Sequence, residues 1–429
     1  MNQTVPASDV DPFAPEVLAD PYPMYTSLRE AGPLVWLERY GVWASARYAT
    51  VRAAVLDHDT FSSATGVGLA DLSRRQPASD RDAGMAGGDR EAGWRTPSLL
   101  LEQDPPDHTR ARRVVGSVLS PSAVRAKADA WAAEAETMVR ALVGTGEFDA
   151  VSRLAQEFPL RLFADAVGLP REGRAEHLLP FADFAFNAFG PPNELFRKSV
   201  SSGNTALPWV VRHCYPDRLD PDGWGARIHA LALREGYSRD EGAVLVRSLL
   251  AAGIDTTVRS LGTVLWLLAT HPEQYAELRA RPELIRPAFD EAVRLESPTR
   301  MFFRSVTADT VLDGVELPAG SRLLLLFGAA NRDPRRWDRP EEFDITRRSG
   351  GHLGFGVGIH ACVGRIVAYL EAEVMLRALI RWAPVLRAGG PPRWHLNNTI
   401  RGLAELPLTL ASGEETGGSR PNGGDDGPH

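Results

Sequence analysis

The sequence has little that could form covalent cross-links or cross a membrane. Only two of its 429 residues are cysteines, Cys214 and Cys362, which excludes a disulfide framework and predicts a reducing, cytoplasmic location. No run of about 18 apolar residues occurs, so no membrane span is expected. The N-terminal segment lacks the basic and apolar regions of a secretory signal.

Charge and missing motifs exclude further classes of partner. The formal net charge of −7 argues against nucleic acid as the main partner. No repeat of about 20–50 residues is visible. The chain also lacks a flavin or dinucleotide fingerprint, so a redox reaction would need electrons from another protein.

Most of the chain has the apolar spacing of amphipathic helices. We expect helices over residues 21–32, 121–143, 152–168, 239–270, 272–280, 284–296 and 362–382. Shorter alternating stretches predict hairpins with turns at Tyr40-Gly41, Asp313-Gly314 and Ala319-Gly320. The fold class is therefore mainly α with small β-sheets.

The domain prediction is a single domain over residues 1–412. Residues 73–93 are polar and rich in glycine, which predicts a mobile surface loop within that domain. Residues 413–429 contain no core-forming side chains and predict a disordered tail.

Residues 352–364, HLGFGVGIHACVG, place several glycines around Cys362. A nucleotide loop is excluded because the third glycine of G-x-G-x-x-G is missing and no βαβ unit surrounds the stretch. Cys362 could be a small buried residue in a turn, or part of a zinc site with His352 and His360, although no paired ligand cluster is present. It could also be a thiolate offered to a flat cofactor, because glycines allow close backbone approach and a following helix stabilises the anion.

The same stretch resembles the haem-binding signature F-x-x-G-x-H-x-C-x-G of the cytochrome P450 family at every fixed position. In that family the cysteine is the axial ligand of haem b (iron protoporphyrin IX), and its thiolate favours O–O cleavage. The resemblance implies that Cys362 is the metal ligand and that Phe355, His360 and Gly364 contact the haem. It also implies the cytochrome P450 fold, with the haem between a long distal helix and the helix that follows the cysteine loop.

Further motifs resemble the same family. Glu291 and Arg294 match its E-x-x-R motif, and Arg347 stands where the family has the third member of a structural network that supports the cysteine loop. An isolated pair at i,i+3 is weak evidence, because such pairs contribute only about 0.2–0.5 kcal/mol and are common.

The resemblance also implies partners for the haem propionates. These are His108, Arg112, Arg304 and His360. Two carboxylates at the rim of an apolar macrocycle need charge-assisted donors. The alternative for each arginine is an ordinary solvated surface charge.

Residues 239–270 are expected to cross the distal face of the haem. Gly253 costs about 1 kcal/mol relative to alanine in a helix, and the family pattern A-G-x-D/E-T gives a reason for it. By resemblance, Ala252 and Gly253 leave room for dioxygen at a local bulge, and Asp255 and Thr256 are catalytic residues that deliver protons. The alternative is that Thr256 bonds its own i−4 carbonyl and only bends the helix.

Helical spacing also predicts the shape of the substrate. Ser248, Ala252 and Thr256 are spaced by four and share one face, so Ser248 lies two turns, or about 12 Å, from Thr256. A polar group at the far end of an apolar pocket suits a substrate with one polar head and one oxidisable end.

Several stretches resemble a narrower group of bacterial cytochrome P450 enzymes that oxidise para-substituted benzoates such as 4-methoxybenzoate. These stretches are FNAFGPPNEL, LVRSLL, GAANRDPRRW and NNTIRGL. The resemblance implies carboxylate contacts from Arg95, Ser98 and Ser248, and ring contacts from Phe186, Phe189 and Phe302 beside Ala252. The alternative for Phe186 and Phe189 is simple core packing.

Three departures from that group bear on specificity. Ala251 stands where the group tends to have a serine, which removes a donor. Arg300 replaces a neutral residue and is expected to add a positive charge to the pocket wall. The 73–93 insertion directly precedes Arg95 and is expected to displace it.

The resemblance therefore implies a haem-thiolate monooxygenase that hydroxylates or O-demethylates a para-substituted benzoic acid. It would use O2 and electrons from a [2Fe-2S] ferredoxin with an NAD(P)H-dependent reductase, and act as a monomer. Arg112, Arg113 and Arg365 are expected near the cysteine side, where they would meet an acidic ferredoxin. Alternatives are another small aromatic acid as substrate, a peroxide-driven enzyme, or a non-catalytic haem-thiolate protein.

Overall fold

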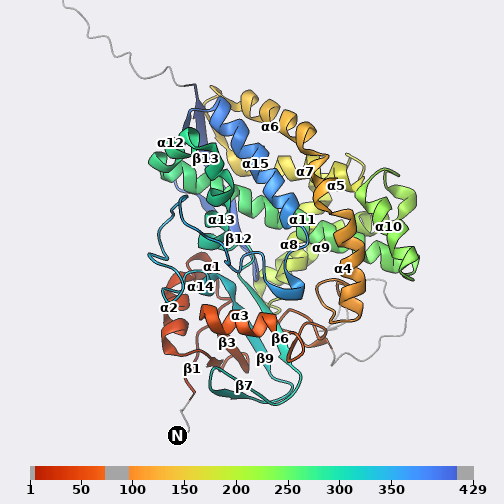
Figure 1. Ribbon diagram of the computed structural model, residues 1–429, viewed down its shortest axis with the longest axis vertical. Helices are drawn as coiled ribbons and strands as arrows, with labels where there is room; N and C mark the ends of the chain where they lie inside the picture. Colours follow the sequence, from red (N-terminus) through yellow and green to blue (C-terminus); the bar gives the residue numbers. More distant parts are fainter. Residues whose placement is uncertain (1–4, 73–95, 413–429) are drawn as a thin grey trace, which may run out of the picture.

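The computed structural model describes residues 5–72 and 96–412. The predicted loop over 73–93, the predicted tail over 413–429 and Arg95 lie outside these described residues. Figure 1 shows two regions, a strand-rich end with the helices near the N-terminus and a larger part built of helices. Among the described residues, no helix is both long and apolar enough to cross a bilayer.

Helices dominate the described chain, as predicted. The α-helices are α1 (Pro15–Ala19), α2 (Tyr22–Ala31), α3 (Tyr48–Leu56), α4 (Asp107–Val118), α5 (Pro121–Arg125), α6 (Ala128–Leu142), α7 (Glu157–Val167), α8 (Arg174–Asn187), α9 (Glu194–His213), α10 (Trp224–Arg234), α11 (Arg239–Thr270), α12 (Pro272–Ala280), α13 (Ile285–Glu296), α14 (Phe327–Ala330) and α15 (Arg365–Trp382). Shorter turns are the π-helical η2 (Val151–Gln156) and the 3₁₀-helical η3 (Pro216–Arg218), η4 (Pro282–Leu284) and η5 (Gly358–His360).

The predicted bounds of α11 and α12 are confirmed because local signals mark them. Ser238 and Glu241 form a capping box at the start of α11, and Pro272 begins α12 directly after His271. Elsewhere the spacing of apolar residues predicts the helices less completely. Residues 174–213 form α8 and α9, which the sequence analysis does not predict, and each of these helices contains an internal proline.

Four small sheets accompany the helices. The strands are β1 (Ala7–Ser8), β2 (Val35–Leu37), β3 (Val42–Ser45), β4 (Phe61–Ser62), β5 (Glu147–Asp149), β6 (Met301–Val306), β7 (Thr310–Leu312), β8 (Val315–Leu317), β9 (Arg322–Leu326), β10 (Val385–Ala388), β11 (Arg393–Leu396), β12 (Arg401–Glu405) and β13 (Pro407–Ala411). The largest sheet has the order β1-β2-β3-β9-β6-β4, and the others are β10-β13-β5, β11-β12 and β7-β8.

Two of the predicted hairpins are confirmed and one is wrong. Trp36 pairs with Trp43 across the β2–β3 hairpin, and β7 pairs with β8 around Asp313-Gly314. The turn at Ala319-Gly320 does not make a hairpin, because β9 pairs with β3 and β6 instead. All five residues of β9 are buried, so this continuous apolar strand belongs inside the large sheet, beside neighbours on both edges.

Helix α11 is the central element of the helical part. It contacts α7, α8, α10 and α13, and its residues from Ile254 to Leu265 are almost all buried. Helix α15, which follows the cysteine loop, packs against α6 and α13 (Figure 1). The two helices that the resemblance places on either side of a haem therefore belong to one packed body.

A carboxylate is buried where α15 faces α11. Glu371 is 0% exposed, and neither of its carboxylate oxygens has an aligned hydrogen bond among the described residues. Burial raises the pKa of Glu371 to about 8, against a smaller opposite effect of the Thr257 hydroxyl on α11. The side chain is therefore protonated at neutral pH and behaves as a polar but uncharged core residue.

We predict that Glu371→Gln removes a pH-dependent loss of stability. An acid whose pKa is raised by folding destabilises the protein as the pH rises from its unfolded value to its folded value. For Glu371 this window runs from pH 4.5 to about 8, and it corresponds to about 3–5 kcal/mol. Thermal unfolding at pH 5 and pH 8.5 should show a melting temperature for the variant that exceeds that of the unmodified protein only at the higher pH.

The matched control is Glu273→Gln on the exposed side of α12. It should shift the melting temperature equally at both pH values. A gain for Glu371→Gln that is the same at pH 5 and pH 8.5 would contradict the prediction.

Candidate functional site

A cavity of about 1690 Å³ lies between α8, α11 and the cysteine loop. Its wall is mostly apolar, with polar groups gathered at two places. Many of the residues singled out from the sequence line it, namely Ser98, His108, Arg112, Phe186, Phe189, Ser248, Ala251, Ala252, Gly253, Thr256, Phe302, Arg304, Phe355, His360, Cys362 and Gly364. Asp255, Glu291, Arg294 and Arg347 do not line it.

Cys362 is exposed, but to this cavity. Its backbone N–H donates to the carbonyl oxygen of Phe355 at 2.8 Å, and Gly356 and Gly358 adopt the positive φ angles of 64° and 67° that turn the loop. Helix α15 begins at Arg365 and not at Cys362, because Gly364 forms its N-cap.

The surroundings of the Cys362 thiol act on it in opposite directions. Burial within the protein raises the pKa of the thiol, while the backbone N–H groups of Gly364 and Arg365 and the charge of Arg112 lower it. The predicted helix terminus therefore does face the sulfur, three residues later than expected.

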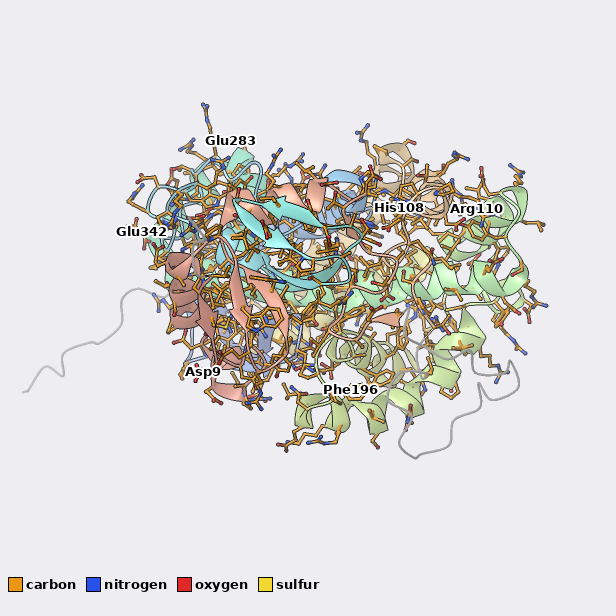
Figure 2. The ribbon with its side chains drawn as sticks, turned by 90° about the horizontal axis from the view of Figure 1, so that it is seen from below. Asp9, His108, Arg110, Phe196, Glu283 and Glu342 are labelled. Carbon is orange, nitrogen blue, oxygen red and sulfur yellow. The ribbon has the colours of Figure 1, made fainter. Side chains whose placement is uncertain are left out.

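Four polar side chains gather beside Cys362 at one edge of the cavity. The rings of His108 and His360 lie 4.3 Å apart, centre to centre, and Figure 2 shows His108 between the strand-rich and helix-rich ends of the molecule. Arg304 donates to the carbonyl of Phe303 at 2.8 Å, and Arg112 donates to the carbonyl of Ala361.

Within the described chain, the two histidines lack hydrogen-bond partners for some of their ring nitrogens. Both ring nitrogens of His108 and Nε2 of His360 are buried without a hydrogen-bond partner among the described residues. Burial, with the nearby charge of Arg304, lowers the pKa of His360 to about 2, and burial lowers the pKa of Arg304 to about 10. Burial, with the nearby charge of Arg112, also lowers the pKa of His108. Both histidines are thus neutral and Arg304 is charged at neutral pH, a donor set that suits the two carboxylates of a haem.

The face of α11 toward the cavity differs from the expected one. Helix α11 is a regular α-helix throughout, without the local bulge, and the Thr256 hydroxyl donates to the carbonyl of Ala252 at 2.6 Å. A Cβ atom on Gly253 would overlap the ring of Phe163 on α7. Close packing of α7 against α11 therefore explains this glycine, and Ala251, Ala252 and Gly253 all line the cavity.

Asp255 points away from the cavity into a group of charged side chains. It is 0% exposed, and Oδ1 lies 2.8 Å from a guanidinium nitrogen of Arg259, at ion-pair distance but without hydrogen-bond alignment. Its carboxylate also lies within 4.8 Å of ligand atoms of Asp183 and His395. Burial raises the pKa of Asp255, and Arg259 opposes that effect.

The sequence analysis missed the partners of Asp255. Nε2 of His395 lies 2.7 Å from Oδ1 of Asp183, and both side chains are about a quarter exposed. This pair therefore connects the molecular surface with the buried carboxylate. Arg259 has a local signal, since it follows Asp255 by four residues on one helix, whereas Asp183 and His395 come from α8 and β11 and have none.

Ser98 and Ser248 meet at the other polar part of the cavity, where Ser98 Oγ lies 3.0 Å from Ser248 Oγ. Arg247 lines the same end and donates to the carbonyl of Thr96 at 3.3 Å. The sequence analysis missed Arg247, although it lies inside the quoted stretch LVRSLL. The predicted third member, Arg95, lies outside the described residues.

Three aromatic rings form one wall of the cavity. The Phe186 and Phe189 ring centres are 6.0 Å apart, and those of Phe189 and Phe302 are 5.7 Å apart, both in edge-to-face arrangements. Ala251 also lines the cavity.

The expectation for Arg300 is wrong. Its side chain is 1% exposed and does not line the cavity, and it donates to the carbonyl of Asn397 at 3.4 Å. Burial lowers its pKa to about 10, with a smaller opposite effect of Tyr25. Phe302 lies within β6, whereas Arg300 precedes the strand, so the side-chain alternation of β6 does not set its direction. The backbone N–H of Arg300 donates to the carbonyl of Thr399 at 3.1 Å, which holds this residue against the 397–399 segment and away from the cavity.

Behind the cysteine loop lies a buried ion-pair network. Arg294 contacts both carboxylate oxygens of Glu291, at 2.8 and 2.9 Å, and Arg347 Nε donates to Oε1 at 2.9 Å. Ser349 Oγ donates to Oε2 at 2.7 Å. Glu291 thereby fastens α13 to the segment that leads into the cysteine loop.

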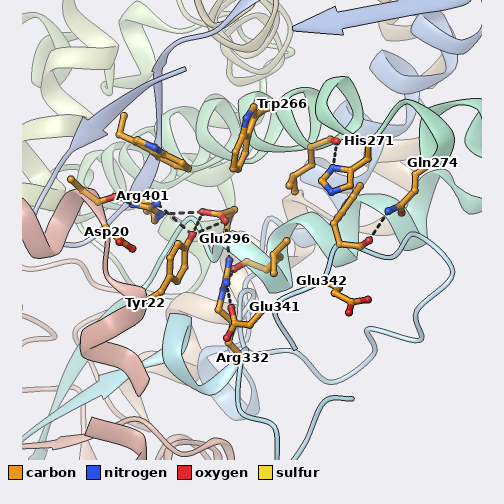
Figure 3. A pocket seen from close by; sticks show the side chains of 15 residues that line it. Asp20, Tyr22, Trp266, His271, Gln274, Glu296, Arg332, Glu341, Glu342 and Arg401 are labelled. Atoms are coloured by element: carbon orange, nitrogen blue, oxygen red, sulfur yellow. Dashed lines mark hydrogen bonds and ion pairs between the residues drawn. The ribbon is translucent and has the colours of Figure 1, made fainter. Parts of the chain in front are cut away.

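A second, smaller cavity of about 730 Å³ lies apart from this site (Figure 3). Glu296 accepts hydrogen bonds there from Tyr22, Arg332 and Arg401, at 2.6 to 3.0 Å. Its central charges are thus paired with one another, and we assign this cluster to the joining of α2, α13 and β12.

The three arginines expected near the cysteine side differ in availability. Arg112 turns inward to Ala361, and Arg113 forms a 2.8 Å ion pair with Glu235. Arg365 is exposed at the start of α15.

Comparisons with known proteins agree on one family. The family model described as cytochrome P450 matches residues 227–382. Cytochrome P450 CYP199A2 of Rhodopseudomonas palustris is 46% identical over 407 residues, covering 95% of each chain. A β-dihydromenaquinone-9 ω-hydroxylase of Mycobacterium tuberculosis is 31% identical, covering 94% of this chain and 78% of that protein. The solved structure of cytochrome P450 CREJ with (4-ethylphenyl) dihydrogen phosphate has a TM-score of 0.81 at 26% identity, covering 93% and 98% of the two chains.

We predict that Glu291→Ala lowers the free energy of unfolding by about 3–5 kcal/mol, because it leaves the fully buried Arg294 without its counter-charge. Urea unfolding followed by circular dichroism measures this. Glu283→Ala, which removes an exposed pair with Arg281, is the control and should cost less than about 1 kcal/mol. Equal effects of the two substitutions would show that the buried network does not stabilise the fold.

Proposed function

Because the chain belongs to the cytochrome P450 family, we propose that it oxidises a para-substituted benzoic acid such as 4-methoxybenzoate, by hydroxylation or O-demethylation. Members of this family are monooxygenases that bind haem b through a cysteine thiolate. The observation that carries the proposal is the cavity itself, which joins Cys362, an aromatic wall and a hydroxyl pair at its far end.

The residues around Cys362 fit the haem. Cys362 would be the iron ligand, and His108, Arg112, Arg304 and His360 would bind the propionates with donors that the protein otherwise leaves under-used. Phe355, Gly364 and Ala252 would contact the macrocycle. When bound, the haem supplies the activation of O2.

The far end of the cavity would bind the carboxylate of the substrate. The Ser98 hydroxyl now donates to Ser248, and the Ser248 hydroxyl donates to the carbonyl of Val244 at 2.9 Å; both would turn to donate to the carboxylate. Arg247 lines the same end and would add a charge, with Arg95 expected as a further partner. Ser248 is two helical turns, or about 12 Å, from Thr256. A benzoate held at Ser248 would therefore extend its para substituent toward the Cys362 side, which makes the choice of the oxidised carbon a matter of geometry.

The aromatic wall would fix the plane of the substrate ring. Phe186, Phe189 and Phe302 present edges and faces to a narrow part of the cavity, where offset contacts with a benzene ring are favourable. The structural neighbour CREJ was solved with a para-substituted aromatic anion, (4-ethylphenyl) dihydrogen phosphate, which supports this substrate class.

Proton supply would come through α11. Thr256 lines the cavity, and its hydroxyl would turn from the carbonyl of Ala252 to donate into the cavity. Asp255 lies behind it, close to the partly exposed pair of Asp183 and His395, from which it can be reprotonated.

Electrons would come from a [2Fe-2S] ferredoxin and its NAD(P)H-dependent reductase, because the chain carries no flavin or dinucleotide fingerprint. The exposed Arg365, three residues after Cys362, is the best-placed of the three arginines to meet an acidic partner, since Arg113 is paired and Arg112 faces inward.

The proposal predicts the outcome of an optical titration of the ferric, haem-loaded protein. Para-substituted benzoates should shift the absorbance toward the high-spin form, while the ortho and meta isomers should not, because only the para isomer fits between the hydroxyl pair and Cys362. A terpenoid or alicyclic compound that binds more tightly than every benzoate would overturn the proposed substrate class.

We predict that Asp255→Asn lowers product formation by about 100-fold or more while leaving benzoate binding within about twofold, because Asp255 moves protons but does not line the cavity. Turnover with ferredoxin and reductase measures the first quantity, and the optical titration measures the second. A rise in the solvent deuterium isotope effect should accompany the slower turnover.

The control for this prediction is Asp129→Asn, which removes an exposed carboxylate from α6 and should change neither quantity. Normal turnover by Asp255→Asn would remove this residue from proton delivery. Product formed by the unmodified protein from hydrogen peroxide alone, at the full rate, would favour the peroxide-driven alternative.

A further inference from the structure

Three consecutive polar residues lie behind the aromatic wall and do not touch the cavity. Asn397, Asn398 and Thr399 connect β11 with β12, and they are 1%, 0% and 2% exposed. None of them lines the cavity. Buried amide and hydroxyl groups need hydrogen bonds, so the partners of these three residues show what the segment holds.

The partners of Asn398 lie at both ends of the loop that follows α8. Its backbone N–H donates to Asn187 Oδ1 at 3.0 Å, and its Nδ2 donates to the carbonyl of Asn187 at 2.9 Å and to Asn193 Oδ1 at 3.2 Å. Asn193 Nδ2 donates back to Asn398 Oδ1 at 2.8 Å. One side chain thus joins the end of α8 to the N-cap of α9, and Phe189 lies in the loop between them.

The residues on either side of Asn398 bind the last turns of α8. The Thr399 hydroxyl donates to the carbonyl of Phe186 at 2.9 Å. Asn397 Nδ2 donates to the Asp183 carbonyl at 3.1 Å and to its carboxylate at 2.9 Å. The final carbonyls of a helix have no partner further along the helix, so these contacts fix the direction in which α8 ends.

The loop also packs too closely to shift without breaking these bonds. A Cβ atom on Gly190 would lie 2.5 Å from the Asn398 side chain, and one on Gly68 would lie 2.8 Å from the Phe189 backbone. From a segment near the N-terminus, the Leu69 N–H donates to the Phe189 carbonyl at 2.8 Å. The backbone of the aromatic wall is therefore held from two sides.

We infer that Asn398 and Thr399 are positioning residues that set Phe186 and Phe189 against the ring of the substrate. The inference rests on the proposed function only in giving these two phenylalanines a substrate ring to pack on. Loops that carry binding residues are usually mobile, and the hydrogen bonds behind this one replace that mobility with a defined wall. A defined wall discriminates between ring isomers, because a ring held in one plane can place only its para position near Cys362.

The test compares Thr399→Val with Thr399→Ser in the haem-loaded protein. Valine has the shape of threonine without the hydroxyl, whereas serine keeps the donor to Phe186. We expect Thr399→Val to reduce the preference for 4-methoxybenzoate over 3-methoxybenzoate, measured as the ratio of dissociation constants, by about five- to tenfold. Thr399→Ser should restore it to within about twofold, and Asn398→Ala should act like Thr399→Val.

The control is Thr137→Val on the exposed side of α6, where the lost hydroxyl donates only to the carbonyl of Ala133. It should leave the isomer ratio unchanged. If Thr399 only stabilised the fold, Thr399→Val would lower the melting temperature without changing the isomer ratio, and this result would contradict the inference. In a background that carries both Phe186→Ala and Phe189→Ala, Thr399→Val should have little further effect, because a residue that acts through these two rings cannot act once they are gone.

Hydrogen exchange gives a readout that does not depend on any substrate. Amides of residues 186–190 should exchange about tenfold faster in Thr399→Val and Asn398→Ala than in the unmodified protein. Unchanged exchange together with an unchanged isomer ratio would overturn the inference. If no benzoate shifts the spectrum of the unmodified protein, the proposed substrate class fails, while faster exchange in these variants would still support the positioning of the wall.

Discussion

The position of Cys362 depends on one buried carboxylate. Glu291 is 0% exposed and binds Arg294 on its own helix, Arg347 from a distant segment and Ser349 near the start of the cysteine loop. A buried charge is tolerated only when its partners are in place, so these segments cannot separate without leaving charge in the protein interior. The contacts of Glu291 hold the segment before the loop in place. The glycines of the loop can therefore adopt the positive φ angles that turn the thiol toward the cavity.

The cavity has polar groups beside Cys362 and beside Ser248, and under the proposed function each of these two places would bind an anion. Beside Cys362, the neutral histidines His108 and His360 and the charged Arg304 offer donors whose low dielectric surroundings strengthen their interactions. At the far end, the Ser98 and Ser248 hydroxyl groups and the Arg247 side chain line the cavity. Much of the remaining lining is aromatic or aliphatic, and under the proposed function it would favour one orientation of an elongated molecule with one carboxylate.

The segment from His395 to Thr399 connects the two sides of the proposed reaction. His395 pairs with Asp183 beside the buried Asp255, and Thr399 binds the helix end that carries Phe186. Asp183 belongs to both groups, because Asn397 also donates to it. Under the proposed function, substrate position and proton supply would both depend on this short segment, although none of its residues is marked by a motif.

Local patterns in the sequence were sufficient wherever a feature depends on neighbours in the chain. They determined the bounds of α11, the glycine loop at Cys362, the hairpin at Asp313-Gly314 and the family resemblance. Features that depend on packing between distant segments were decided only by the tertiary structure: the place of β9 in the large sheet, the burial of Arg300 away from the cavity, the regular geometry of α11 at Thr256 and the partners of Asp255. The physical reason is that hydrophobic period, capping and turn chemistry act over a few residues, whereas burial and charge pairing are set by whichever segments the fold brings together.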